Sequence, residues 1–206
     1  MNLNAPVVIG AGGHARSLVS MAPPAERPVM YVAPQPSLPL KWLGDDRAFL
    51  SNPDYDELPV IIGIGFNEKG SLTLRRRIIE LFGNRRFATI VASDAIVAPD
   101  TVIGDGSTVF HRAVINCGAF IGRHTVVNTG AIVEHDVTLG ENTFVGPGAV
   151  ICGACEIGND VFIGAGATLR NGVRIADGVT VGVGAVVVND ITEKGIYIGN
   201  PAKRMK

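Results

Sequence analysis

The clearest candidate for proton-transfer chemistry in this chain is a histidine between two acids, Glu134, His135 and Asp136. An imidazole with an ordinary pKa near 6.5 accepts and returns a proton around neutral pH, which suits a general base. A neighbouring carboxylate can hold one tautomer of the ring and stabilise its cation. The sequence leaves open whether Asp136 or Glu134 has that role. The competing interpretation is that His135 is an exposed residue in a bend of the chain and has no function.

A second candidate site follows the first apolar run, residues 6–9. Residues 10–14 (Gly-Ala-Gly-Gly-His) come next and lead into a segment typical of a helix start. A strand, a glycine turn and a helix N-terminus together offer free backbone N–H groups and a positive helix end to an anion. A tight turn without a ligand is the alternative. A dinucleotide site is disfavoured, because no acid stands about 20 residues further on, where Val32 to Pro34 lie.

Composition excludes several classes of protein. The 206 residues include 18 Lys and Arg against 19 Asp and Glu, a net charge of −1, which argues against nucleic-acid binding. No apolar run reaches the roughly 18 residues that span a bilayer, so we expect no membrane association. The first residues lack the basic region of a secretory signal, and three cysteines make no disulfide framework. We therefore expect a cytoplasmic protein.

The carboxyl-terminal half has a six-residue repeat. From Val97 to Val187 every sixth residue is aliphatic, and the residue four places after each of them is small or β-branched. An α-helix cannot place every sixth residue on one face. A solenoid of short parallel strands satisfies the period, with one hexad per wall, three walls and 18 residues per coil. The sixteen hexads therefore predict about five coils.

Residues 1–92 lack the hexad and predict a small α/β domain. A second apolar run, residues 60–65, ends in glycine and precedes residues 72–82, which have helical spacing. Strands alternating with helices indicate a parallel sheet, whose ligands bind at the carboxyl ends of the strands. Arg75, Arg76 and Arg77 are interpreted as a solvated helix face, with help in phosphate binding as the lesser alternative. Residues 93–206 then form the solenoid and a short tail.

A metal site is disfavoured. His111, His124 and His135 fall on three different predicted walls, and no histidine pair has the spacing that a zinc site between subunits would need. Cys155 is the inward small residue of its hexad, so Cys152 and Cys155 are interpreted as inert thiols rather than as a redox or metal pair.

Four motifs in this order resemble the hexapeptide-repeat nucleotide-sugar acetyltransferases, among them bacillosamine and perosamine N-acetyltransferases and sialic acid O-acetyltransferase. They are residues 9–14 (IGAGGH), 63–68 (GIGFNE), 128–136 (NTGAIVEHD) and 198–203 (IGNPAK), and together they span nearly the whole chain. The resemblance implies a Rossmann-like N-terminal domain and a left-handed parallel β-helix. It also implies a homotrimer with active sites between subunits.

The resemblance implies an activity as well. Acetyl-CoA is expected to donate its acetyl group to an amino group, at C4, of a nucleotide-linked amino sugar, with His135 as general base and Asp136 as its partner. No metal is expected. A sugar O-acetyltransferase, which would use the same base on a hydroxyl, is one alternative. The other is a non-catalytic scaffold that binds sugar nucleotides and only trimerises.

Further site residues follow from matching this chain to the family. The family's phosphate-binding positions correspond to Gly12, Gly13 and His14, with Gly65 beside them and Asn128 as a further substrate contact. A second family histidine that contacts acetyl-CoA is replaced here by Phe144. Stacking at 18 residues places Gly153 next to His135, and the expected apolar strip for the pantetheine arm contains Ala165 and Val183.

Overall fold

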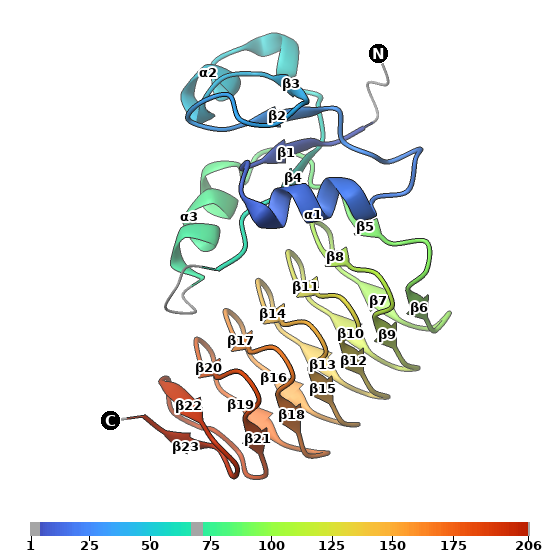
Figure 1. Cartoon of the computed structure of the whole chain (residues 1–206), viewed down its shortest axis with the longest axis vertical. Helices are drawn as coiled ribbons and strands as arrows, with labels where there is room; N and C mark the ends of the chain where they lie inside the picture. The colour runs from blue at the N-terminus through green and yellow to red at the C-terminus, as the bar shows by residue number, and fades with distance from the viewer. Residues whose placement is uncertain (1–4, 67–71, 206) are drawn as a thin grey trace.

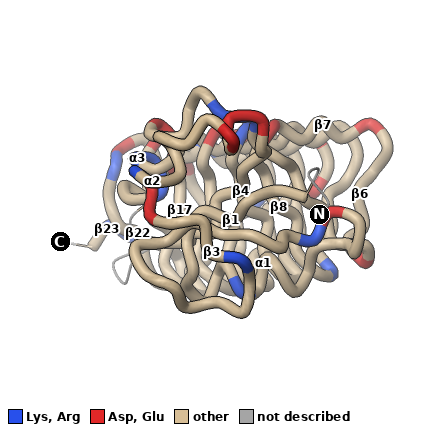
Figure 2. The backbone as a smooth tube through the Cα atoms, turned by 90° about the horizontal axis from the view of Figure 1, so that it is seen from above, with Lys and Arg blue, Asp and Glu red and all other residues tan. Residues whose placement is uncertain are grey.

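The structure, a computed structural model, describes residues 5–66 and 72–205 and has two regions (Figure 1). Asn67 and Glu68, the end of the second motif, lie outside these ranges. None of the helices in residues 5–66 and 72–205 has the length and hydropathy of a membrane span. Figure 2 shows Lys and Arg interspersed with Asp and Glu over both regions, in keeping with the near-zero net charge.

The first region is a four-stranded parallel sheet with helices, as the sequence predicts. The strand order is β3-β2-β1-β4, and β1, β2 and β4 are fully buried apolar runs, which is typical of parallel strands covered on both faces. The elements are β1 (Val7–Ile9), α1 (Gly13–Met21), β2 (Met30–Val32), β3 (Lys41–Trp42), α2 (Asp46–Leu50), the 3-10 helix η1 (Pro53–Tyr55), β4 (Val60–Ile62) and α3 (Thr73–Leu81).

The second region is a parallel β-helix with three walls (Figure 1). Wall 1 contains β5 (Ile90–Val91), β8 (Thr108–Val109), β11 (Val126–Val127), β14 (Phe144–Val145), β17 (Phe162–Ile163), β20 (Thr180–Val181), β22 (Ile196–Ile198) and β23 (Lys203–Arg204). Wall 2 contains β6 (Ile96–Val97), β9 (Val114–Ile115), β12 (Ile132–Val133), β15 (Val150–Ile151), β18 (Thr168–Leu169) and β21 (Val186–Val187). Wall 3 contains β7 (Val102–Ile103), β10 (Phe120–Ile121), β13 (Thr138–Leu139), β16 (Glu156–Ile157) and β19 (Arg174–Ile175).

The hexad prediction is confirmed. Residues 18 apart pair in register, as Val127 does with Val145, and the inward aliphatic and small side chains form one continuous core. The hexads supply six strands to wall 2 and five to each of the other walls, and β5 and β22 extend wall 1 beyond the hexads at both ends, which makes about six coils rather than five. β5 lies just before the expected domain boundary at residue 92, and the separation of 1–92 from 93–206 as independent domains stays a prediction.

The α/β region packs on the outer face of wall 1. Ala15 and Leu18 of α1 share a buried cluster with Val126, Phe144 and Phe162, which point outward from wall 1. Wall 1 is therefore covered along most of its length. The corner where walls 2 and 3 meet, called here corner 2/3, lies on the opposite side of the triangular cross-section.

The interpretation of Arg75, Arg76 and Arg77 as one solvated helix face is wrong. Arg75 is only 1% exposed, and Arg76 forms ion pairs with Glu141 and Asp160 at 2.9 Å each. Of the three, Arg77 alone is exposed without a bonded partner among the described residues. The reason is the docking of α3 against the β-helix, at the corner where walls 3 and 1 meet (corner 3/1).

Candidate active site

His135 and Asp136 form an exposed pair at corner 2/3. The Nδ1 atom of His135 lies 2.9 Å from Oδ2 of Asp136, and the two side chains are 56% and 69% exposed. A carboxylate only accepts hydrogen bonds, so Nδ1 carries the proton and Nε2 of the neutral ring keeps a free lone pair. The corner gives Asp136 a φ of 58°, a left-handed conformation that Asp tolerates better than most residues. The contact with Asp136 therefore fixes the tautomer of the ring and leaves Nε2 available as an acceptor.

Glu134, the other candidate partner of the ring, is engaged elsewhere. Its Oε2 atom accepts a hydrogen bond from Nδ2 of Asn116 at 2.9 Å and one from the backbone N–H of His135 at 3.4 Å. The structure therefore pairs the imidazole with Asp136. The adjacent acid holds the backbone at this corner.

Two glycines of the neighbouring coils leave room for this pair. A Cβ atom at Gly153 would lie 2.5 Å from Nε2 of His135, and one at Gly118 would lie 2.6 Å from Oδ1 of Asp136. The sequence-based placement of Gly153 beside the ring is thus reproduced by the structure. Any side chain at position 153 would occupy the space next to the free lone pair.

We expect Gly153→Ala to fold normally and to slow turnover by about 10- to 100-fold, because a displaced catalytic group costs roughly that much. The new methyl group must push the exposed imidazole aside, which the flexible side chain permits. Initial rates and thermal midpoints of the purified variant test this. Gly172→Asn is the matched control, since Gly172 stands at the same corner with φ 73° and open space around a Cβ atom. Unchanged turnover in Gly153→Ala would contradict the placement of the base.

The glycine turn lies at the carboxyl ends of β1 and β4. Gly10 has φ 109°, and a Cβ atom there would lie 2.9 Å from Cγ1 of Ile64. Gly12 and Gly13 are exposed, and a Cβ atom on Gly12 would meet nothing within 4 Å. Gly12 is the N-cap of α1, and no side chain caps the helix. The first backbone N–H groups of α1 are thus free to bind an anion.

His14 contributes its backbone rather than a charged ring to this turn. The imidazole packs 5.3 Å from the ring of Phe110 and 5.7 Å from that of Phe144, and its Nε2 atom is buried without a hydrogen-bond partner among the described residues. Burial, and then the charge of Arg75, lower the pKa of His14 to about 3, so the ring is neutral at pH 7. A contact of residue 14 with a phosphate would come from its N–H.

His124 is a second buried, neutral histidine. It is 2% exposed and packs edge-on against Phe87, with ring centroids 4.4 Å apart. Burial, followed by the charges of Arg123, Arg75 and Arg76, lowers the pKa of His124 to about 4. Its Nδ1 atom has no hydrogen-bond partner in the described part of the chain.

These two rings predict acid sensitivity. Below pH 6.5 the unfolded imidazoles take up protons while the folded ones stay neutral, so stability falls as the pH drops toward 4 and then 3. Each ring adds a slope of up to about 1.4 kcal/mol per pH unit in that window. Thermal midpoints between pH 7 and 4 should fall less steeply in His124→Asn than in the wild type. The exposed control Arg77→Gln, which leaves both rings in place, should follow the wild type, and equal slopes in all three would contradict the assignment.

The remaining predicted contacts line corner 1/2, where walls 1 and 2 meet. Asn128 is half-buried, and its Oδ1 atom accepts a hydrogen bond from the N–H of Thr129 at 2.7 Å. Ala165 is half-buried, and Val183, 18 residues further on, is 78% exposed. These residues form an open strip along corner 1/2, whereas His135 stands at corner 2/3. A single chain therefore does not bring the base and the strip together.

Phe144 lies apart from the strip. It is 1% exposed and packs with Phe162 of the next coil, 5.7 Å away between ring centroids, beneath the α/β region. A side chain so deeply buried offers no surface to a coenzyme within its own chain. Its visible role is to hold the α/β region against wall 1.

Sequence reasoning missed a second histidine–acid pair. Nδ1 of His111 lies 2.6 Å from Oδ1 of Asp94, and both side chains are about half exposed at corner 1/2. The two residues are 17 apart, one short of a coil, so the 18-residue stacking rule could have found the pair. Since Phe110 next to it contacts His14, this pair stands near the glycine turn.

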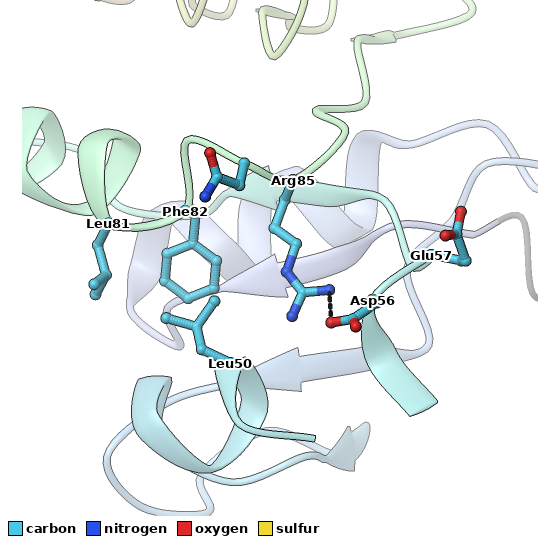
Figure 3. A pocket seen from close by; sticks show the side chains of 7 residues that line it. Leu50, Asp56, Glu57, Leu81, Phe82 and Arg85 are labelled. Atoms are coloured by element: carbon cyan, nitrogen blue, oxygen red, sulfur yellow. Dashed lines mark ion pairs between the residues drawn. The ribbon is translucent and has the colours of Figure 1, made fainter. Parts of the chain in front are cut away.

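Three other features of the described residues give weaker indications of a functional site. The described residues contain no cluster of three or more potential metal ligands. Cys155 is fully buried and points inward, as predicted, and burial raises the pKa of its thiol. A pocket in the α/β region contains the Arg85–Asp56 ion pair at 2.9 Å (Figure 3). It is lined by residues at the end of α2, before β4 and at or after the end of α3, on the side of the amino end of β4, whereas the glycine turn lies at the carboxyl ends of the strands.

Comparisons with known proteins agree with this geometry. The family described as bacterial transferase hexapeptide (six repeats) matches residues 118–153 and 154–189. The acetyltransferase domain of PglB from Neisseria gonorrhoeae, in complex with acetyl coenzyme A, is 31% identical with a TM-score of 0.86, and the match covers 98% of this chain and 100% of that one. The chain belongs to the hexapeptide-repeat acetyltransferase family. No curated protein sequence matches it significantly.

Two further structures of this family have related ligands. PerB from Caulobacter crescentus, in complex with CoA and GDP-perosamine, is 30% identical with a TM-score of 0.88, and the match covers 98% of each chain. A histidine-to-asparagine variant of perosamine N-acetyltransferase from Caulobacter crescentus, with the same two ligands, is 28% identical with a TM-score of 0.89, and 98% of this chain and 97% of that one are covered. This chain is thus similar over nearly its whole length to sugar N-acetyltransferases.

Proposed function

We propose that this protein transfers the acetyl group of acetyl-CoA to an amino group, at C4, of a nucleotide-linked amino sugar. The observation that carries the proposal is the exposed His135–Asp136 pair, whose free Nε2 faces a space kept open by Gly153. The relatives that bind acetyl-CoA, or CoA with GDP-perosamine, support both substrate classes.

The pair suits the chemistry of this transfer. The neutral amine attacks the thioester carbonyl carbon, and Nε2 of His135 takes the proton that the nitrogen loses. The carbon–sulfur bond then breaks, an amide forms, and the CoA thiolate leaves and recovers the proton from the imidazolium. Asp136 holds the ring in the tautomer with Nδ1 protonated and stabilises its cation.

The two substrates are assigned to different elements. The glycine turn with Gly12 and Gly13 receives the diphosphate of the nucleotide, with Gly65 beside it. The strip at corner 1/2, with Ala165 and Val183, receives the pantetheine arm. Both features lie at or beside wall 1, on the side of the molecule away from His135. The nucleotide and the base that serves it therefore belong to different copies of the chain.

Wall 2 has the surface that such an assembly needs. Its outward side chains carry no charge, whereas wall 3 exposes Glu156 and Arg174 and wall 1 is covered. Packing wall 2 of three copies around one axis would bring corner 2/3 of each copy to corner 1/2 of the next. We therefore propose a homotrimer with its sites between subunits. The outward side chains of wall 2 are Ile96, Val114, Ile132, Val150, Thr168 and Val186.

The test is CoA release from acetyl-CoA with a panel of GDP-, UDP- and dTDP-linked sugars bearing an amino or only hydroxyl groups, followed by mass and NMR analysis of the product. The proposal predicts an amide on one amino sugar. An ester would make the protein an O-acetyltransferase, and the absence of turnover with binding retained would make it a scaffold. Either result overturns the proposal.

A further inference from the structure

Arg75 joins the two regions at the side of the glycine turn. Its guanidinium is completely enclosed and donates from Nη1 to the carbonyl of Ile64 at 2.7 Å and to that of Ile62 at 3.4 Å. It also donates from Nη2 to the carbonyl of His124 at 2.6 Å and from Nε to Oδ1 of Asn142 at 2.9 Å. One side chain thus ties the end of β4 to two successive coils of the β-helix.

The charge of Arg75 has no acidic partner in direct contact. All four acceptors are neutral, and the described residues contain no ion pair to its guanidinium. The carboxylate of Asp160 is reached only through Asn142, whose Nδ2 donates to it at 2.7 Å, and that carboxylate pairs with Arg76. Burial, and then the charge of Arg76, lower the pKa of Arg75 to about 9, so the group is still charged at pH 7.

The bond to Ile64 sets the direction of a neighbouring N–H. In a trans peptide the carbonyl of Ile64 and the N–H of Gly65 point in opposite directions. With that carbonyl held on Arg75, the N–H of Gly65 points away from the guanidinium, and it has no hydrogen-bond partner among the described residues. Gly65 also lies beside His14, since a Cβ atom there would be 3.6 Å from the histidine Cβ. Arg75 therefore stands directly behind the loop that borders the glycine turn.

We infer that Arg75 is a positioning residue for the nucleotide diphosphate. It fixes the Gly65 N–H toward the phosphates, and its unneutralised charge attracts them through the loop without touching them. A buried cation left without a carboxylate is costly to the fold, which a role in anion binding explains. The inference rests on the proposed function, because it assigns this residue to the acceptor half of that site.

The decisive variant moves one negative charge from residue 160 to residue 142, which contacts Arg75. In the double variant Asn142→Asp, Asp160→Asn, the carboxylate comes next to Arg75 while the total charge and side-chain sizes are kept. Both positions have φ near 56°, which Asn and Asp tolerate equally. Arg75→Lys is the second variant, since it keeps the charge but loses the fork that holds the carbonyls. Arg77→Gln, on the exposed face of α3, is the control.

Binding of GDP, UDP and dTDP by calorimetry, together with KM values, measures the effect. We expect both Arg75-directed variants to weaken the binding of nucleoside diphosphates by about 10-fold, because one neutralises the buried charge and the other loses the fork that holds the Ile64 carbonyl and thereby the Gly65 N–H. The KM for acetyl-CoA should change by less than about 2-fold, because the coenzyme strip lies elsewhere. The thermal midpoint should change by no more than a few degrees. Nucleotide binding by the double variant Asn142→Asp, Asp160→Asn should also depend less on salt than binding by the wild type.

The outcomes separate this inference from the proposed function. If the wild type binds a nucleoside diphosphate and both variants bind it with the same affinity, the positioning role alone is overturned. A parallel loss of affinity for acetyl-CoA would also overturn it, since that pattern indicates general damage to the fold. If the wild type binds none of the three nucleotides, the acceptor half of the proposed function fails and this inference falls with it.

Discussion

Replacing His135 by alanine should lower turnover by about 10²- to 10⁴-fold, the usual contribution of a general base. The ring is 56% exposed, and its described contact is the one to Asp136, so its removal leaves the core untouched. The thermal midpoint and the oligomeric state should therefore match the wild type. The KM for either substrate should change little, because the base acts mainly in the transition state. Initial rates of CoA release with saturating substrates give the comparison.

The chain contains a matched control for this variant. His111 pairs with Asp94 at 2.6 Å and is about as exposed, but it stands at corner 1/2. His111→Ala should keep the turnover number within about 3-fold of the wild type, since the base is intact. The turnover number of Asp136→Asn should lie between those of His135→Ala and His111→Ala, because the ring keeps its lone pair but loses the carboxylate that orients it. Wild-type turnover in His135→Ala, or a larger loss in His111→Ala, would contradict the assignment of the base.

Two inactive variants should restore each other when they assemble together. His135→Ala removes the base, and Gly12→Asp puts a carboxylate where the diphosphate should bind. Asp is a favoured N-cap, and the position is open, so Gly12→Asp should fold well. In mixed assemblies, about one site in four combines an intact turn on one copy with an intact His135 on the next, since each occurs with a probability of about one half. Activity near a quarter of the wild type is expected.

The control is the double variant His135→Ala, Gly12→Asp mixed with wild-type chains by the same unfolding and refolding. Mixing it in equal amounts also leaves about one site in four intact. Mixing the two single variants without subunit exchange should restore nothing. If exchanged mixtures of the single variants stay inactive while the control mixture is active, the turn and the base act within one chain, and the composite site is excluded.

Much of the fold was predictable because the β-helix is determined by a local, strictly repeated pattern. An aliphatic residue every sixth position fixes the inward face, and the spacing of 18 then fixes the register, as Ile132 with Val150 shows. The same register alone places Gly153 beside His135. The choice between Asp136 and Glu134 was not accessible, because it depends on the left-handed backbone at Asp136 and on the side chain of Asn116.

The misassigned arginine shows where the sequence was less informative. Arg75 shares one helix face with Ile78, Ile79 and Phe82, so the helical period marks it as inward, whereas its charge suggests exposure. Its acceptors are backbone carbonyls and an amide far along the chain, which no local pattern shows. Phe144 is a similar case, because its burial depends on the docking of the α/β region.

A crystal structure of the protein with CoA and an accepted nucleotide sugar tests the composite site itself. The diphosphate should lie at the glycine turn of one copy, and the sugar nitrogen about 3 Å from Nε2 of His135 of another copy, a distance at which a proton can pass. A sugar nitrogen that contacts no His135, or a turn and a base contributed by the same copy, would contradict it.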